Sequence, residues 1–307
     1  MNLRNVMTVK VELERMTWPE VVERVKEDPF TPVIVLFSST EQHGPHSPLN
    51  TDAFANRKIW KTAAEMVAEE VKPILTPMVP FGVEWEHMGF PGTITLTRET
   101  MTRVAKEIVR SLYLNSGFRK FALIPGCAGQ GPRLALQVAK LELYEEFGPD
   151  IVLWSWDYGN VFLKPAEVEE LREKTEKMDF MKHKWFTGHA GETETSWTLA
   201  LENPDVDMSK AVDTDIKPEW VGLPEDIDFN WFRLLDPIHS WILPRLKERG
   251  PEVAAAGSIG TATRATKEKG ELIIELRIKQ TARFLRWFKK LKPPTGAKPE
   301  HRYGYRP

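Results

Sequence analysis

The 307-residue chain contains very little cysteine and no long apolar stretch. Its single cysteine, Cys127, excludes an internal disulfide framework and a zinc ribbon built from several cysteines, and it suits a reducing cytosol. No run approaches the ~18 consecutive apolar residues that suggest a membrane span. Residues 1–14 also lack the apolar core of a secretory signal. We therefore expect a cytoplasmic protein that does not cross a membrane.

A large excess of charge of either sign is also missing. The 42 Lys and Arg residues nearly balance the 44 Asp and Glu residues, and the formal net charge is −2. A surface that binds nucleic acid or an anionic membrane needs a basic excess or a basic patch, so we expect neither partner. The hydrophobic fraction of 41% is ordinary for a globular enzyme. A chain of this length can bury a core that needs no structural metal.

Short apolar segments typical of buried strands alternate with amphipathic segments typical of helices. Strands are expected at 33–37, 74–79, 93–96 (a strand or hairpin arm), 120–124 and 151–156, and helices at 52–71, 98–116, 132–147, 167–177 and 267–291. This alternation indicates an α/β protein with a mostly parallel sheet covered by helices on both faces. We expect a single three-layer α/β/α domain over residues 1–292, with an insertion at about 160–188 and a C-terminal tail at 293–307.

A polar turn follows the first expected strand, at the end of the strand where α/β proteins place their sites. It holds four side chains that can bind a metal: Glu41, His43, His46 and Asp52. Glu41 and His43 are two residues apart and project from the same side of an extended chain. Carboxylate and imidazole ligands suit zinc, manganese or iron. From the residues alone, a structural turn in which Asp52 caps the next helix stays an equal alternative.

These residues belong to a series of motifs that resembles the creatininase (creatinine amidohydrolase) family. Residues 41–52 match the family's opening signature, roughly Glu-Gln-His-Gly-Pro-His-Leu-Pro-Leu-x-Thr-Asp, except at Ser47. Further matches lie at 80–94, at 189–196 and, more weakly, at 257–270, in the family's order. The resemblance covers about residues 30–290 and implies a creatininase-like fold.

The resemblance also implies a centre that holds two divalent metal ions per chain. It makes Glu41, His43 and Asp52 ligands, with Asp52 bridging the two ions. His189 corresponds to a family histidine that gives or takes a proton near the substrate. Glu194, five residues further on, corresponds to a ligand or to a residue that supports one.

The turn after the strand at 120–124 departs from the family pattern. The family has Asn-Gly-His-Gly-Gly-Asn or a relative of it there, and its histidine binds metal, whereas residues 125–130 read Pro-Gly-Cys-Ala-Gly-Gln. Cys127 thus stands at the histidine position. As a thiolate ligand it would favour zinc or iron over manganese. Two alternatives stay open: a small buried residue packed behind the turn, or a nucleophile with His189 as its base.

Residues that bind the substrate are expected near the second motif and at the end of the strand at 151–156. Glu86 and His87 lie in a matched loop, although a structural hydrogen bond from His87 to the backbone is an equal alternative. Trp156 is a candidate for contact with a flat ring. His46 is expected to fix the shape of its loop.

Together, these features predict a metal-dependent hydrolase that opens a small cyclic substrate. Two ions would lower the pKa of a shared water toward ~7, hydroxide would attack a carbonyl, and His189 would protonate the leaving group. The resemblance implies a cyclic amide or formamide, or an oxidised cyclic polyol such as a keto-inositol, and a homo-oligomer such as a hexamer. The alternative, suggested by the missing histidine, is a non-catalytic relative that binds a metal or ligand or acts in assembly.

Overall fold

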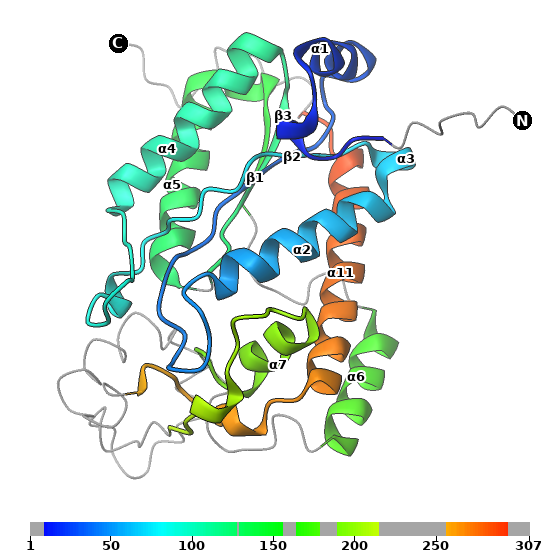
Figure 1. Ribbon diagram of the computed structural model, residues 1–307. Coiled ribbons are helices and arrows are strands. Elements are labelled where there is room, and N and C mark those ends of the chain that lie inside the picture. Colours follow the sequence, from blue (N-terminus) through cyan, green and yellow to red (C-terminus); the bar gives the residue numbers. More distant parts are fainter. Residues whose placement is uncertain (1–8, 128, 156–163, 179–188, 215–255, 294–307) are drawn as a thin grey trace, which may run out of the picture.

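One parallel sheet forms the centre of the described structure (Figure 1). A computed structural model of the chain describes residues 9–127, 129–155, 164–178, 189–214 and 256–293. Within these residues the strand order is β2-β1-β3-β4, and every pairing is parallel. The strands are β1 (Val33–Leu36), β2 (Ile74–Leu75), β3 (Lys120–Ile124) and β4 (Val152–Ser155).

Helices connect and cover these strands. The α-helices are α1 (Trp18–Glu27), α2 (Thr51–Met66), α3 (Ala68–Val71), α4 (Arg98–Ser111), α5 (Gln130–Phe147), α6 (Pro165–Lys177), α7 (Glu192–Ala200) and α11 (Lys267–Lys290). Short helical turns are η1 (Leu13–Arg15), η2 (Trp85–His87), η3 (Leu112–Ser116), η4 (Gly148–Asp150), η5 (Met208–Lys210) and η7 (Ala262–Arg264). None of the described helices is both long enough and apolar enough to span a bilayer.

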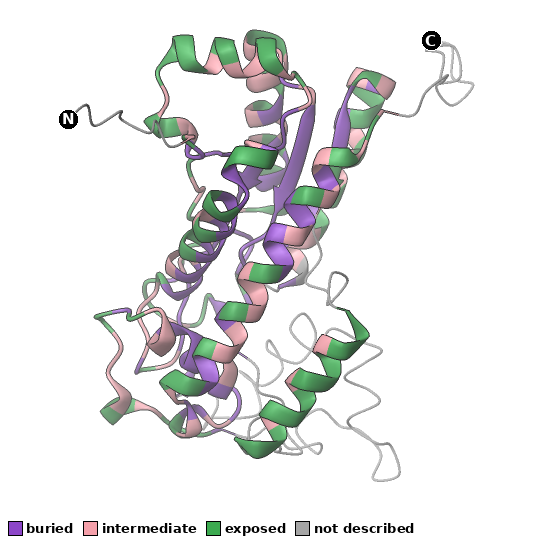
Figure 2. Cartoon of the chain, turned by 90° about the vertical axis from the view of Figure 1, so that its right-hand side faces the viewer, coloured by how far each residue is buried: buried purple, intermediate pink, exposed green. Residues whose placement is uncertain are grey.

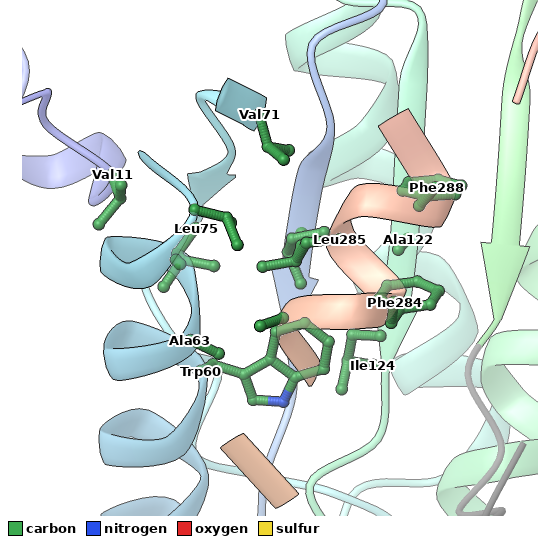
Figure 3. Close-up of a cluster of buried hydrophobic side chains, with 14 of the residues drawn as sticks. Val11, Trp60, Ala63, Val71, Leu75, Ala122, Ile124, Phe284, Leu285 and Phe288 are labelled. Carbon is green, nitrogen blue, oxygen red and sulfur yellow. The ribbon is translucent and has the colours of Figure 1, made fainter. Parts of the chain in front are cut away.

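Each face of the sheet carries its own hydrophobic core because successive strand residues point to opposite sides. Figure 1 shows α4 and α5 on one side of the sheet and α2 and α11 on the other. The core beneath α2 and α11 includes Ile34, Leu36, Ala122, Ile124, Trp60, Phe284, Leu285 and Phe288 (Figure 3). The core beneath α4 and α5 includes Val33, Val35, Phe121, Leu123, Met101, Val109, Leu136 and Leu143. The predicted three-layer α/β/α architecture is therefore confirmed.

The boundaries of several elements differ from the prediction. The strand expected at 74–79 ends at Leu75, since Pro77 lacks the N–H that a ladder needs, and pairing resumes only as an isolated bridge between Phe37 and Val79. No strand forms at 93–96, where two isolated bridges hold the segment instead. The helix expected at 52–71 breaks at Val67, whose N–H bonds to the carbonyl only three residues back.

The longest described helix, α11, links the sheet to the segment that carries the third motif. Its C-terminal half packs on the sheet, and its N-terminal half packs on α7. Gly270 permits this close contact, because a Cβ there would lie 1.9 Å from the carbonyl oxygen of Ser196. A buried ion pair between Lys269 and Glu192, at 2.5 Å, joins the same two helices. Figure 2 shows buried residues along α11, in contrast to α6, which has none.

A buried lysine fixes the other end of α11. Lys120 on β3 is inaccessible to solvent, and its ammonium donates to the carbonyls of Phe288, Lys289 and Leu291 at 3.0, 2.8 and 2.7 Å. The last carbonyls of a helix lack partners within the helix, and a positive charge complements that end of the helix dipole. Lys120 therefore anchors α11 to the central strand of the sheet.

We expect Lys120→Met to lower the free energy of unfolding by about 2–4 kcal/mol, because the carbonyls of Lys289 and Leu291 lose the ammonium that donates to them. Lys290→Met changes an exposed lysine at the same helix end and should cost less than about 0.5 kcal/mol. Urea unfolding followed by circular dichroism measures both values. Equal stability of the two variants would show that the carbonyls do not need Lys120.

Candidate metal centre

The first motif forms a tightly held loop at the carboxyl end of β1. The backbone N–H of Glu41 donates to the carbonyl of Leu49 at 3.1 Å, and a bridge pairs His43 with Ser47. Glu41 and His43 are fully buried. Asp52 lies in the first turn of α2, close to the same loop. The structure thus brings the three residues together, as the spacing predicts.

The Nε2 atom of His43 is a buried nitrogen without a hydrogen-bond partner in the described part of the chain. It faces carboxylate oxygens of Glu41, Asp52 and Glu194 at 3.9, 3.6 and 3.6 Å. Ligand atoms that surround one ion tetrahedrally at ~2.0–2.2 Å lie roughly 3.3–3.6 Å apart, which is close to these separations. His43 Nδ1 meets the backbone carbonyl of Glu41 at 3.1 Å, as a second-shell contact to a metal-binding histidine does.

Three imidazole rings lie close together beside these carboxylates: His87 stacks on His189, and His43 is tilted against it. The ring of His189 lies between those of His43 and His87, with centroid distances of 4.4 and 4.1 Å. Its Nε2 is 2.5 Å from the backbone carbonyl of Gln42, to which it donates. Its Nδ1 consequently faces the carboxylate of Glu41 at 3.7 Å. The predicted proton carrier is therefore held inside the cluster with a defined ring orientation.

Gln42 is a positioning residue that the sequence analysis missed. Its side-chain oxygen accepts from the N–H of Gly44 at 2.9 Å, and its amide nitrogen donates to the carbonyl of Gly257 at 2.7 Å. These partners fix the amide orientation, so the same nitrogen donates to Nδ1 of His87 at 3.0 Å. The Nε2 atom of His87 then faces Glu41 at 4.0 Å. The sequence signals for Gln42 were its place between two predicted ligands and its match to the family signature.

The Cys127 side chain points into the cluster. Its sulfur lies 3.6 and 3.8 Å from the two carboxylate oxygens of Glu41 and accepts from the N–H of Gly129 at 3.3 Å. The turn packs closely against the residue that follows β1. A Cβ at Gly126 would lie only 2.5 Å from the carbonyl oxygen of Phe37. Glu41, Asp52 and Cys127 form one of three groups in the described structure that could hold a metal ion. The other two are Glu41, His87 and His189, and His43, His189 and Glu194.

The surroundings of Cys127 do not favour a nucleophile. Burial, together with the charges of Glu41 and Glu84, raises the pKa of the thiol well above its usual value. A nucleophilic cysteine needs the opposite shift, because the thiolate is the reactive form. A bound cation would reverse the effect and keep the sulfur deprotonated. The environment is therefore better suited to a ligand than to a nucleophile.

The third motif presents Glu194 from the first turn of α7. One of its carboxylate oxygens accepts from the N–H of Ala190 at 2.6 Å. Ala190 adopts a positive φ of 55°, which is uncommon for a residue other than glycine and is often found at functional sites. His46 joins this segment to the first motif, since its Nε2 lies 2.9 Å from the hydroxyl of Thr195. His46 therefore connects two motifs, and its expected role in fixing the shape of its own loop stays a prediction.

Among the described residues, carboxylates outnumber the positive groups in this cluster. Burial and the charges of Glu84 and Asp52 raise the pKa of Glu41 well above its usual value. Burial, with a contribution from Asp52, also raises the pKa values of Glu84 and Glu194 to about 7. Burial lowers the pKa of His43, but Asp52 and Glu194 outweigh it and raise that pKa to about 9. Divalent cations fit this donor set, because they would supply the missing positive charge.

The structure describes two of the three residues that are predicted to bind the substrate. Glu86 is buried beside the Cys127 turn, where a Cβ at Gly129 would lie 3.1 Å from its carboxylate. Burial and the charge of Glu84 raise the pKa of Glu86 to about 8. His87 belongs to the imidazole stack. Trp156 lies outside the described residues.

Comparison with known sequences identifies relatives along most of the chain. The Creatininase family model, described as creatinine amidohydrolase, matches residues 14–285. A creatinine amidohydrolase of Pseudomonas putida is 28% identical over 292 residues, which cover 91% of this chain and 98% of the relative. A 3-dehydro-scyllo-inosose hydrolase of Thermotoga maritima is 29% identical over 277 residues, which cover 86% of this chain and 79% of the relative. A mycofactocin precursor peptide peptidase of Mycolicibacterium smegmatis is 28% identical over 259 residues, which cover 83% of this chain and 85% of the relative.

Solved structures share the fold. A creatininase with a single substitution has a TM-score of 0.67 and 25% identity, over 92% of this chain and 100% of that chain. A manganese creatininase has a TM-score of 0.66, and a creatininase mutant of the zinc–zinc type has one of 0.65. Both are 24% identical, again over 92% of this chain and 100% of the other. The family match and the shared fold lead to one conclusion: the chain belongs to the creatininase family of hydrolases.

Proposed function

We propose that this hydrolase uses two divalent metal ions to open a small cyclic substrate at a carbonyl group. The observation that carries the proposal is the partnerless Nε2 of His43, which faces three carboxylate oxygens at ligand-like separations. Two relatives are named for cyclic compounds, creatinine and an inosose. A cyclic amide or an oxidised cyclic polyol is therefore the substrate class that we propose.

The donor atoms include two neighbouring groups. Glu41, Asp52 and Cys127 form one, and His43 and Glu194, together with His189, form the other. Asp52 accepts a hydrogen bond from the Ser39 hydroxyl at 2.7 Å through one oxygen and faces His43 with the other, which suits a ligand between two ions. Divalent cations bound there would polarise a carbonyl and lower the pKa of a bound water. The thiolate favours zinc or iron, with manganese as the alternative.

His189 is the residue that we propose to move a proton. Its Nε2–H is held by the carbonyl of Gln42, which leaves Nδ1, beside Glu41, as the atom that takes up or delivers the proton. The neighbouring rings of His43 and His87 restrict rotation of this imidazole. A fixed orientation helps because proton transfer requires close alignment with the reacting group.

We propose that the substrate is recognised by Glu86, His87 and Trp156. Glu86 has an unpartnered oxygen and a pKa raised to about 8 by burial and by the charge of Glu84, so its neutral form can donate a hydrogen bond near pH 7. His87 adjoins both Glu41 and His189. Trp156 would supply a flat surface for a ring.

We also propose a cytoplasmic homo-oligomer, such as a hexamer, without a nucleic-acid or membrane partner. The balanced charge and the single buried thiol support this setting. Exposed apolar residues on α5, including Leu134 and Leu141, are candidates for a contact between subunits. The proposed domain extends over 1–292, with the insertion at about 160–188 and the tail at 293–307.

Glu41→Gln and Asp52→Asn should each lose bound metal and all turnover, because each removes a charged ligand from the proposed centre. Elemental analysis of the purified protein and assays with creatinine and a keto-inositol measure the two effects. Glu65→Gln changes an exposed carboxylate on the same helix as Asp52 and should retain both properties. Full metal content in both ligand variants would refute the dinuclear centre.

Cys127→Ser tests the thiolate ligand. We expect zinc or iron occupancy to fall and affinity to weaken by more than about 10-fold, since loss of a ligand costs at least as much as loss of a second-shell partner. In cobalt-substituted protein the sulfur-to-metal charge-transfer absorption should disappear. Full occupancy together with the full rate would show that the thiol is not needed.

The stability of metal-free protein should fall as the pH rises from about 5 to 7. Glu84 and Glu194 have pKa values raised to about 7 by burial and by Asp52, against ~4.3 for an unfolded glutamate. Folded protein therefore binds more protons in this window, and the stabilisation present below ~4.3 is lost as the pH passes ~7.

Thermal unfolding of chelator-treated protein should show a decrease in Tm of at least about 3 °C across that range. Zinc-saturated protein is the control, and it should show the opposite trend because metal binding competes with protons. A constant or rising Tm without metal would contradict the pKa assignment.

A further inference from the structure

Gln42 contacts two buried histidines, and each contact determines which ring nitrogen carries the proton. Its backbone carbonyl accepts from Nε2 of His189 at 2.5 Å, and its side-chain nitrogen lies 3.0 Å from Nδ1 of His87. Gln42, His87 and His189 are all buried. The backbone of Gln42 is itself held, because its N–H donates to the hydroxyl of Thr93 at 3.1 Å. The proton positions of both rings therefore follow from the contacts of this one residue.

Two backbone groups fix the side-chain amide of Gln42 in one of its two orientations. The N–H of Gly44 can only donate, so its partner at 2.9 Å is the amide oxygen. The carbonyl of Gly257 can only accept, so its partner at 2.7 Å is the amide nitrogen. A flipped amide would set nitrogen against N–H and oxygen against carbonyl, and two buried hydrogen bonds would be lost. The atom that faces His87 is therefore the amide nitrogen, a donor.

His87 and His189 consequently present opposite functions to the site. Nδ1 of His87 accepts from Gln42 and carries no proton, so the neutral ring has its proton on Nε2, which faces one oxygen of Glu41 at 4.0 Å. In His189 the proton is on Nε2, and Nδ1 faces the other oxygen of Glu41 at 3.7 Å. A donor N–H and an acceptor nitrogen thus lie side by side, on rings whose centroids are 4.1 Å apart.

We propose that His87 donates its Nε2–H to the carbonyl oxygen of the substrate and is not a metal ligand, and that the Gln42 amide sets this role. The inference rests on the proposed function and gives one residue of that site a defined task. Glu41, His87 and His189 lie close enough together to hold an ion, but the neutral His87 ring offers it no lone pair, because Gln42 engages Nδ1 and a proton occupies Nε2.

A fixed donor at this position stabilises the negative charge that develops on the carbonyl oxygen during attack. The hydrogen bond transfers nothing, because the proton of His87 stays on its nitrogen. The proton that the reaction moves passes through Nδ1 of His189, on the adjacent ring. Gln42 is the positioning residue for both rings, through its side chain for His87 and through its backbone for His189.

Nitrogen NMR of the zinc-loaded, full-length protein with isotope-labelled histidine reports the proton positions, because a ring nitrogen that carries a proton resonates far upfield of one that does not. We expect Nε2–H in both His87 and His189, and the spectrum of His87→Asn assigns the His87 signals. Gln42→Glu replaces the donor by an acceptor and should move the His87 proton to Nδ1. His189 is the internal control, because its partner is a backbone carbonyl that the substitution retains.

A proton on Nδ1 of His87 in the unchanged protein would overturn the inference, and this measurement requires no variant to fold. An unchanged Nε2–H in Gln42→Glu would show that the amide does not set the proton position.

Two amide substitutions separate the donor function of His87 from its contact with Gln42. Asparagine places its amide near the position of Nδ1 and does not reach that of Nε2, whereas glutamine places its amide near Nε2. We expect His87→Asn to lower kcat for creatinine or a keto-inositol at least about 100-fold with a smaller change in KM, since the hydrogen bond strengthens as the charge develops. His87→Gln should keep at least about ten times the kcat of His87→Asn. Elemental analysis should show the metal content of the unchanged protein in both variants.

The remaining outcomes have distinct meanings. Loss of metal from both variants would make His87 a ligand and overturn the inference. A kcat in His87→Asn equal to or above that in His87→Gln would show that only the contact with Gln42 matters, and it would also overturn the inference. Absence of metal or of turnover in the unchanged protein would contradict the proposed function, and the NMR measurement would still decide whether His87 presents a donor or a lone pair.

Discussion

The crowding of four acidic side chains in one place, three of them buried and Glu194 partly buried, is the constraint on which the site depends. Glu41, Asp52, Glu84 and Glu194 are held near one another and near the Nε2 atom of His43. In water each carboxylate would be hydrated, and in the protein that hydration is lost while the negative charges repel one another. Protons can neutralise part of this charge, which is why the pKa values of Glu84 and Glu194 rise to about 7 through burial and Asp52. Divalent cations can neutralise it at neutral pH and satisfy the free atoms at the same time.

The fold can hold this unfavourable cluster because packing outside the site keeps the surrounding backbone in place. The cores on both faces of the sheet determine where β1 and β3 end, and the loops carrying Glu41 and Cys127 start there. The third motif approaches from α7, which α11 holds through the contact at Gly270. Lys120 in turn fixes the far end of α11 to β3. The stability of the hydrophobic layers thus offsets the cost of concentrating charge at their edge.

Local regularities predicted the layers, whereas most of the candidate site residues followed from motifs that resemble the creatininase family. Alternating apolar strands and amphipathic helices reveal an α/β sandwich, and the spacing of Glu41 and His43 puts both on one side of the chain. Glu84 and Gln42 were missed for a different reason. The burial of Glu84 follows from the packing of its loop, and Gln42 acts through partners as distant in sequence as Gly257. Such features follow from tertiary packing, so spacing alone does not reveal them.

The protonation state and the reactivity of Cys127 depend on whether a cation is present. Without one, burial and the neighbouring carboxylates keep the thiol protonated, and it is a poor nucleophile. With one, the same carboxylates become ligands, and the cation's charge stabilises the thiolate. The surroundings that disfavour nucleophilic catalysis therefore favour coordination, and metal binding at the thiol releases its proton. A neutral imidazole at position 127 would release no such proton, so the cysteine links metal affinity to pH more strongly than a histidine would.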